Sequence, residues 1–200
     1  LRLIETLNYS AQRGTKLVQQ ILSFAQAGSS VSAVLAIDEL LVETHQIVQQ
    51  TLPQTINSHL DVPSDLWLVN GNETQLHQVF MNLCVNARDA MPNGGMLRVS
   101  ASNLVIDESY LVMHGEATVG PHVKVTVADG GIGIAPDIQK QIFDPFFTTK
   151  APKQGTGLGL AAVLNIVKSH GGFIDLKTAV GQGSQFHIYL PATPDSVSVA

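Results

Sequence analysis

The chain has 200 residues, of which 44% are apolar, and its formal net charge at pH 7 is −5. A chain of this size and composition can bury one core of ordinary domain size and one small additional element. The acidic balance leaves no general basic surface that would neutralise a nucleic-acid backbone, and the sequence has no Lys/Arg cluster of the kind that binds anionic lipid. Neither nucleic acid nor a membrane surface is therefore an expected partner.

The cysteine content and the apolar runs favour a cytoplasmic setting. Cys84 is the only cysteine, which excludes an internal disulfide, and its apolar neighbours indicate a buried reduced thiol. No apolar run reaches the roughly 18 residues that a membrane span needs, and no signal-peptide pattern opens the chain. Because the chain begins with Leu1 rather than Met, we expect a fragment, and a membrane anchor elsewhere in the full-length protein stays open.

The first part of the chain predicts a long amphipathic helix. Apolar residues recur at spacings of three and four through residues 1–27, and the small polar residues at 28–32 then break the pattern as a linker would. The predicted organisation has four parts, which are a helix over 1–28, a linker over 29–33, a domain over 34–192 and a tail or linker over 193–200.

The domain itself mixes helices and strands. We predict a short strand over 34–37 and then a helix that Asp38 caps and whose apolar face includes Leu41, Ile47 and Val48. Two strands, over 55–60 and 66–69, are expected to pair around the turn region 61–65. The remaining predicted elements are a helix over 73–91, strands over 96–106 and 123–128, a helix over 158–170, and strands over 173–178 and 184–190. This mixed order with a final hairpin favours an α+β two-layer α/β sandwich over a doubly wound parallel sheet.

A polar stripe runs along the helix predicted over 73–91. Asn82, Asn86 and Asp89 are spaced i, i+4 and i+7, so that they share one helical face. Asparagines on adjacent turns can present carbonyl oxygens to a hard cation, and Mg²⁺ usually takes one or two protein oxygens beside phosphates and water. The alternative is a solvated helix face, which this segment alone does not exclude.

A glycine-rich segment, 129–134, directly follows a predicted strand. Its glycines permit backbone conformations that other residues rarely adopt, and the lack of side chains leaves room for a ligand against the main chain. Asp129 at the strand end can accept a hydrogen bond from an exocyclic amine such as that of adenine. The alternative is a glycine-rich turn with Asp as a turn former. The dinucleotide-binding fingerprint does not fit, because no helix begins at these glycines with the required spacing.

A second glycine-rich segment, 155–160, leads into a predicted helix. Free backbone N–H groups at a helix N-terminus suit a phosphate, and glycines keep side chains out of its way. The alternative is a flexible helix entry without a ligand. No Gly-Lys-Ser/Thr follows, which excludes the ordinary P-loop class.

The segment 142–150 lies between the two glycine-rich segments. The loop that follows it, up to Gly155, is polar and bounded by glycine, which suits a lid over a triphosphate, and Lys150 can then reach a phosphate oxygen. We expect Phe143 and Phe146 to pack in the core and anchor this lid.

Together these four segments resemble the N, G1, F and G2 boxes of sensor histidine kinases in order and spacing, over residues 34–191. Residues 1–27 resemble the second helix of the hairpin through which these kinases dimerise and carry their phosphorylated histidine. Asn-Ala-Arg-Asp-Ala-Met at 86–91 and Phe-Asp-Pro-Phe-Phe-Thr-Thr-Lys at 143–150 are most similar to the nitrogen-regulation subgroup. The resemblance implies the Bergerat (GHKL-type) ATP-binding fold, with ATP and Mg²⁺ as cofactors.

The resemblance also implies roles for individual residues. Asn86 is expected to bind Mg²⁺ and Asn82 to lie beside the phosphates, both as part of the catalytic machinery, while Asp129 binds the adenine amine. The full set of expected nucleotide contacts is Asn82, Asn86, Asp89, Asp129, Gly131, Gly133, Ile134, Phe147, Lys150, Gly155, Thr156, Gly157, Leu158, Gly159 and Leu160. The sequence departs from the family pattern at Asn72, where an Asp often begins the helix, and at Gly130, where Thr or Asn is usual.

The residue one helical turn before Asn86, the asparagine expected to bind Mg²⁺, distinguishes a kinase from related ATPases. Gyrase B, mismatch-repair and chaperone ATPases of this fold place a water-activating glutamate one turn before that asparagine, whereas here the position is Asn82, which cannot act as a general base. A neutral imidazole needs no base. Histidine is therefore the expected phosphate acceptor, with a response-regulator aspartate next in the relay and a homodimer formed through the complete hairpin.

The acceptor histidine is expected on the first hairpin helix, upstream of Leu1, because residues 1–40 contain no histidine. The seven histidines present are expected to be structural or exposed, although His77 lies near the N box and is a candidate for approaching the nucleotide. Two alternatives stay open, which are a hydrolysing ATPase of the same fold and a degenerate ATP-binding or dimerisation scaffold.

Overall fold

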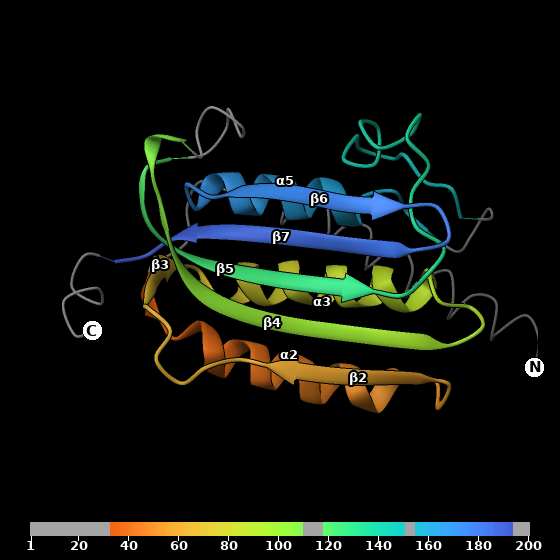
Figure 1. Ribbon diagram of the computed structural model, residues 1–200, viewed down its shortest axis with the longest axis horizontal. Coiled ribbons are helices and arrows are strands. Elements are labelled where there is room, and N and C mark those ends of the chain that lie inside the picture. Colours follow the sequence, from red (N-terminus) through yellow and green to blue (C-terminus); the bar gives the residue numbers. More distant parts are fainter. Residues whose placement is uncertain (1–32, 110–117, 151–154, 194–200) are drawn as a thin grey trace, which may run out of the picture.

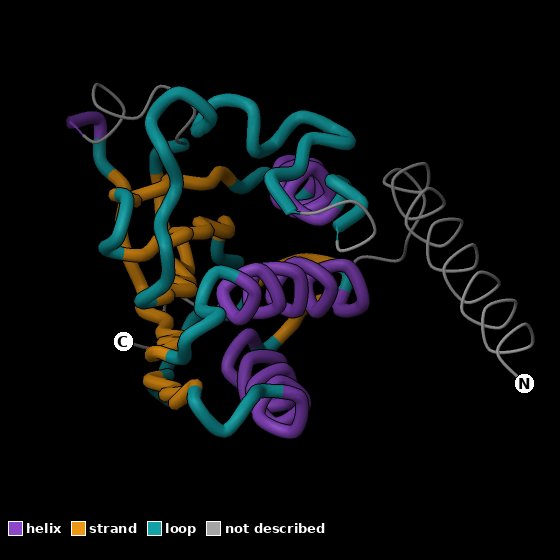
Figure 2. The backbone as a smooth tube through the Cα atoms, turned by 90° about the vertical axis from the view of Figure 1, so that its right-hand side faces the viewer, coloured by secondary structure: helices purple, strands orange, loops and turns teal. Residues whose placement is uncertain are grey.

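The computed structural model describes residues 33–109, 118–150 and 155–193. The predicted helix over 1–28, nearly all of the predicted linker and all but the first residue of the predicted tail lie outside these ranges. The described residues form two layers, a five-stranded sheet and three helices that all cover one face of it (Figures 1 and 2). The predicted α+β two-layer sandwich is confirmed. Within the described ranges, no helix has both the length and the apolar character needed to cross a bilayer.

The main sheet has the strand order β2-β4-β5-β7-β6. Its strands are β2 (Ile56–Asp61), β4 (Gly95–Ile106), β5 (Gly120–Asp129), β6 (Phe173–Ala179) and β7 (Gly183–Pro191). All neighbouring strands are antiparallel except β2 and β4, which are parallel. The predicted final hairpin is confirmed as β6 and β7.

The predicted pairing of 55–60 with 66–69 is wrong. β2 pairs with β4 instead, and β3 (Val69–Gly71) pairs with β1 (Ala33–Leu35) in a separate two-stranded sheet. The chain between β2 and β3 is held against β4, because the Asn103 side chain accepts a hydrogen bond from the Trp67 amide (2.9 Å) and donates one to the Asp65 carbonyl (2.8 Å). The connection therefore runs along β4 rather than folding back as a hairpin.

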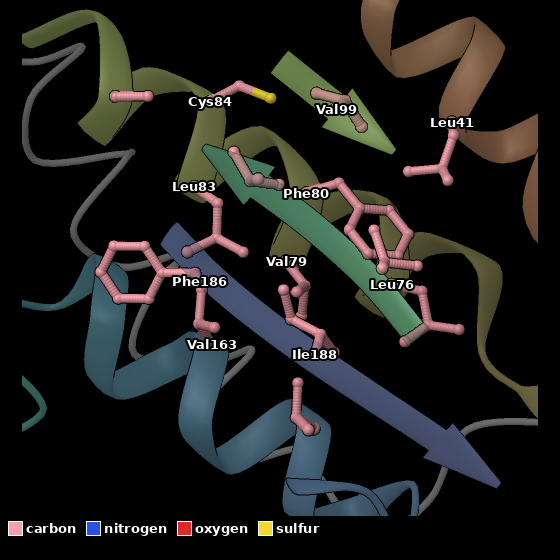
Figure 3. Close-up of a cluster of buried hydrophobic side chains, with 14 of the residues drawn as sticks. Leu41, Leu76, Val79, Phe80, Leu83, Cys84, Val99, Val163, Phe186 and Ile188 are labelled. Carbon is pink, nitrogen blue, oxygen red and sulfur yellow. The ribbon is translucent and has the colours of Figure 1, made fainter. Parts of the chain in front are cut away.

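The core lies between the sheet and the helices α2 (Ile37–Thr51), α3 (Glu73–Asp89) and α5 (Gly159–Ser169). Alternate residues of the central strands, such as Ile188, point toward the helices and meet Val79 and Leu83 of α3 and Val163 of α5 (Figure 3). Cys84 belongs to this cluster, and burial raises the pKa of its thiol to about 12, as expected for a buried reduced cysteine.

The start of α2 differs from the prediction. The N-cap position is Ala36 and the helix begins at Ile37, which is fully buried, so the preceding strand ends at Leu35. Asp38 lies in the first turn, where its charge suits the helix dipole, but it does not cap the helix. Leu41 and Val48 are buried as predicted, whereas Ile47 is 36% exposed.

A polar junction fixes the start of α3 to the end of α5. Asn72 caps α3, because its side-chain oxygen accepts a hydrogen bond from the Gln75 amide at 2.9 Å. The Asn72 amide donates to Nε2 of His170 (3.0 Å), and the other ring nitrogen, Nδ1, lies 2.7 Å from the Ile166 carbonyl. Since Nε2 must accept, the neutral ring carries its proton on Nδ1. Both helices are thereby held in fixed positions beside the cavity described next.

Candidate functional site

A cavity of about 640 Å³ opens between α3, the loop after β5, the segment 142–150 and the start of α5. All four segments singled out in the sequence contribute to its wall. Of the predicted nucleotide contacts, Gly131 and Leu158 do not line it and all the others do. The lining residues are Asn82, Val85, Asn86, Ala87, Arg88, Asp89, Ala90, Asp129, Ile132, Gly133, Ile134, Ile138, Ile142, Phe147, Thr148, Thr149, Lys150, Gly155, Thr156, Gly157, Gly159, Leu160, Ser184 and Phe186.

At one end of the cavity the wall combines a buried carboxylate with apolar side chains. Asp129 is the last residue of β5 and only 9% exposed, and its Oδ1 accepts a hydrogen bond from the Gly131 amide at 2.8 Å. Burial raises the pKa of this carboxyl, although hydrogen bonds from the Gly131 and Ser184 backbone partly oppose the rise. The cavity is also lined by four isoleucines and by Phe186. The isoleucines are Ile132, Ile134, Ile138 and Ile142.

Gly131 lies behind the cavity wall, between Asp129 and the end of α3, and therefore does not line the cavity. A Cβ on it would overlap the Ala90 carbonyl oxygen and lie 2.7 Å from Asp129 Oδ1. Its small size lets the loop pack directly on the end of α3, where the Ile132 amide donates to the Ala90 carbonyl at 3.0 Å. The loop is therefore attached to the helix that carries the polar stripe.

At the other end the polar stripe of α3 faces the start of α5. The Asn82 side chain donates a long hydrogen bond to the Gly159 carbonyl (3.4 Å), and the position of a Cβ on Gly159 would be 3.9 Å from Asn86 Nδ2. The asparagines thus lie directly against the glycine-rich helix entry. This arrangement places amide side chains and a helix N-terminus on one wall, which suits an anionic group and its cation.

Lys150 joins the segment 142–150 to α3. Its ammonium donates to Asn86 Oδ1 (3.2 Å) and to Asp89 Oδ2 (2.6 Å), while Arg88 contacts the other oxygen of Asp89 at 2.8 Å. Burial acts to raise the pKa of Asp89, but hydrogen bonds and charges from Lys150 and Arg88 outweigh it, so the pKa is lowered. Asp89 is therefore ionised and neutralised by two cations at neutral pH.

The prediction for the aromatic residues is half right. Phe143 packs edge-to-face on Phe186 at the edge of the core, with ring centroids 6.5 Å apart. Phe146 is 69% exposed and has a positive φ of 69°, so its predicted core position is wrong. Its amide donates to the Gly157 carbonyl at 2.9 Å, and the chain turn that makes this bond directs the ring outward.

Gly157 is required at this contact. It has a φ of +68°, and a Cβ on it would overlap the backbone of Phe146. This close approach brings the segment 142–150 against the start of α5 and closes one side of the cavity.

His77 does not line the cavity, and its Nε2 is buried without a hydrogen-bond partner. No histidine in the described part of the chain lines the cavity. Several lining residues were not predicted from the sequence, although Val85 follows from the spacing i+3 after Asn82 on the same helical face. Ser184 and Phe186 carry no local signal, because only the pairing of β7 with β5 brings them to Asp129.

Comparison with known proteins identifies the family. Residues 71–194 match the family described as histidine kinase-, DNA gyrase B- and HSP90-like ATPase. Sensor kinase CckA of Brucella abortus is 36% identical over 188 residues, which are 94% of this chain and 20% of that protein. Sensor histidine kinase ZraS of Escherichia coli K12 is 34% identical over 191 residues, 95% of this chain and 37% of that protein. The chain thus spans well under half of these curated relatives.

Solved structures agree with these matches. The mycobacterial sensor histidine kinase MprB superimposes with a TM-score of 0.65 at 27% identity, covering 82% of this chain and 99% of that one. Full-length ShkA in complex with AMPPNP gives a TM-score of 0.73 at 28% identity, covering 92% of this chain and 37% of that one. The similarity to the nitrogen-regulation subgroup stays a prediction. The chain belongs to the family of histidine kinase-, DNA gyrase B- and HSP90-like ATPases, and its described domain has the ATP-binding catalytic fold found in sensor histidine kinases.

Proposed function

We propose that this domain binds Mg²⁺·ATP and transfers the γ-phosphate to a histidine on the dimerisation hairpin of the full-length protein. From there the phosphate passes to an aspartate of a response-regulator receiver domain. The observation that carries the proposal is one cavity with a buried carboxylate in an apolar wall at one end and asparagine side chains beside a helix N-terminus at the other. These two ends match the two chemically different halves of ATP.

The Asp129 end suits adenine. One carboxylate oxygen accepts the Gly131 amide, which orients the group, and the other can accept a hydrogen bond from the exocyclic amine. The surrounding isoleucines and Phe186 supply an apolar surface for the ring. A purine with a carbonyl at that position, such as guanine, presents an acceptor to an acceptor and is disfavoured.

The α3 and α5 end suits the phosphates and the metal. Asn86 is the residue that would hold Mg²⁺, since its side-chain oxygen already accepts a hydrogen bond from a cation, the Lys150 ammonium. Mg²⁺, when bound, neutralises phosphate oxygens during transfer. Asn82 and the amides at the start of α5 would orient the phosphates, and Lys150 would contribute a further positive charge.

The residues around this end favour phosphoryl transfer to histidine over hydrolysis. Transfer requires an imidazole nitrogen to form the bond to the γ-phosphorus while the bond to the bridging oxygen breaks and ADP leaves. The imidazole lone pair is free without a base, and Asn82 offers none. The absence of histidine from the cavity wall in the described residues agrees with an acceptor that comes from another part of the protein.

Nucleotide binding is the first test. Calorimetric titration with a non-hydrolysable ATP analogue is expected to show saturable binding that Mg²⁺ strengthens. Asp129→Asn keeps an acceptor for the Gly131 amide but turns an N–H toward the adenine amine, so affinity should fall about 10- to 100-fold, the loss of a hydrogen bond to a charged group. Asn86→Ala should instead remove most of the Mg²⁺ dependence. Asp65→Asn, at an exposed site in the β2–β3 connection, is the matched control.

The acceptor is tested separately. With a hairpin that carries its histidine supplied as a second polypeptide, we expect acid-labile phosphate on that hairpin and little phosphate release in its absence. Steady release without the hairpin would favour a hydrolysing ATPase. Failure of the folded wild-type domain to bind nucleotide would overturn the catalytic proposal and leave the scaffold alternative.

A further inference from the structure

Asn86, Asp89 and Lys150 form a hydrogen-bonded group at the phosphate end of the cavity, and the proposed nucleotide chemistry gives Asp89 no role. The Lys150 ammonium lies between Asn86 Oδ1 at 3.2 Å and Asp89 Oδ2 at 2.6 Å. Asn86 and Asp89 are three residues apart on α3, so their oxygens project from the same face of the helix. The two oxygens converge on one position, and a cation occupies it.

Arg88 fixes the direction of the Asp89 carboxylate. Its guanidinium contacts Asp89 Oδ1 through Nε at 3.0 Å and through a terminal nitrogen at 2.8 Å. This leaves Oδ2 to face Lys150. The carboxylate is therefore oriented toward the cation position by Arg88 as well as by Lys150.

The chemistry of this position fits a hard divalent cation as well as an ammonium. A carboxylate oxygen and an amide oxygen are the protein ligands that Mg²⁺ takes beside phosphates and water. An ammonium and a metal ion cannot occupy the same place, and Lys150 now contacts Asn86, the residue proposed above to hold the metal. Entry of Mg²⁺ at Asn86 must therefore displace the ammonium.

Asp89 also needs an explanation as a carboxylate on the wall of a phosphate site. An uncompensated negative charge there would repel a triphosphate. In the described structure Lys150 and Arg88 compensate it. When Lys150 leaves, a divalent cation at the same position restores the compensation.

We propose that Asn86 and Asp89 form a single cation site that Lys150 and Mg²⁺ occupy in turn. Asp89 holds Lys150 against α3 without nucleotide, and it contacts the metal, directly or through water, when the exchange releases Lys150 toward the phosphates. The metal role rests on the proposed function. The competition between Lys150 and the metal ion does not rest on the proposed function, because it can be measured without nucleotide.

The test uses Mn²⁺ as the probe and the domain without nucleotide. Binding is followed by the loss of the free Mn²⁺ signal in electron paramagnetic resonance. Lys150→Met removes the competing ammonium and is expected to tighten Mn²⁺ binding about tenfold, the effect of removing one nearby charge. Lys150→Met combined with Asp89→Asn should return the affinity to the wild-type value or below it.

Two controls separate a site from a general charge effect. Lys140→Met removes an exposed lysine from the same part of the chain, outside the cavity wall, and should leave Mn²⁺ binding unchanged. Lys150→Gln provides a second variant that also lacks the charge. Equal Mn²⁺ affinities in the wild type and both Lys150 variants, or a gain that persists in the double variant, would overturn the proposal. Failure of the wild-type domain to bind the ATP analogue, with the Mn²⁺ results as expected, would instead count against the proposed function.

Discussion

Burial of Asp129 favours the protonated carboxyl group, whereas the proposed hydrogen bond to adenine requires the ionised carboxylate. Burial at the end of β5 raises its pKa, so the folded domain disfavours the ionised form that accepts the hydrogen bond proposed for adenine. Only the Gly131 and Ser184 backbone groups oppose this effect. In the proposed function, Asp129 therefore contributes to ligand recognition at the expense of stability.

This conflict predicts that Asp129→Asn is more stable than the wild type at neutral pH, by about 0.5–2 kcal/mol, the usual range for a single stabilising substitution. The group binds a proton more tightly when folded, so its stabilising effect is full below the ordinary carboxyl pKa of 3.8 and is lost as pH rises through the raised folded value. The gain of the variant should thus appear at pH 7 and shrink toward zero near pH 3. Urea unfolding at both pH values measures it, and a variant less stable than the wild type at pH 7 would contradict this account.

At the scale of elements, the junction between α3 and α5 sets the geometry of the phosphate end. His170 accepts the hydrogen bond of the Asn72 amide and lies so close to Gly71 that a Cβ there would be 2.7 Å from its ring. The ring therefore fills space and satisfies a donor at the same time. Asn82 and Gly159, which meet in the cavity, depend on the helix spacing that this junction maintains.

We expect His170→Ala to destabilise the domain by about 1–3 kcal/mol, because it leaves the Asn72 amide without its partner. His59→Ala, at an exposed position of β2, is the matched control and should change stability by no more than about 0.5 kcal/mol. Thermal unfolding reports the difference. Equal unfolding temperatures for the two variants would mean that a water molecule accepts the Asn72 hydrogen bond in place of the ring with no loss of stability.

At the scale of the whole molecule, the described residues contain a complete core. The sheet, its three covering helices and the cavity all lie between residues 33 and 193. The predicted boundary at the linker is therefore open to a direct test. A chain cut to 33–193 is expected to keep its unfolding temperature within a few degrees and its affinity for the ATP analogue within about twofold. Loss of either property on cutting would show that the removed segments belong to the folded domain.

The element types and the segments that line the cavity were predictable from the sequence. The helices, all the longer strands and the polar stripe of Asn82, Asn86 and Asp89 follow from periodicity within one stretch of chain. The two glycine-rich segments likewise show as local composition, and the resemblance to histidine kinases joined them into one site. These features were predictable because each depends on neighbours a few residues away.

The contacts between distant groups could not be predicted from the sequence and became visible only in the folded structure. The parallel pairing of β2 with β4 requires a crossover, whereas local spacing favours a hairpin. Ser184 reaches the cavity through strand register, and Phe146 turns outward because its amide bonds to Gly157. The contacts of Lys150 with Asp89 and of His170 with Asn72 join residues 61 and 98 positions apart. No periodicity encodes such pairs, because they form only when packing brings separate elements to the same place.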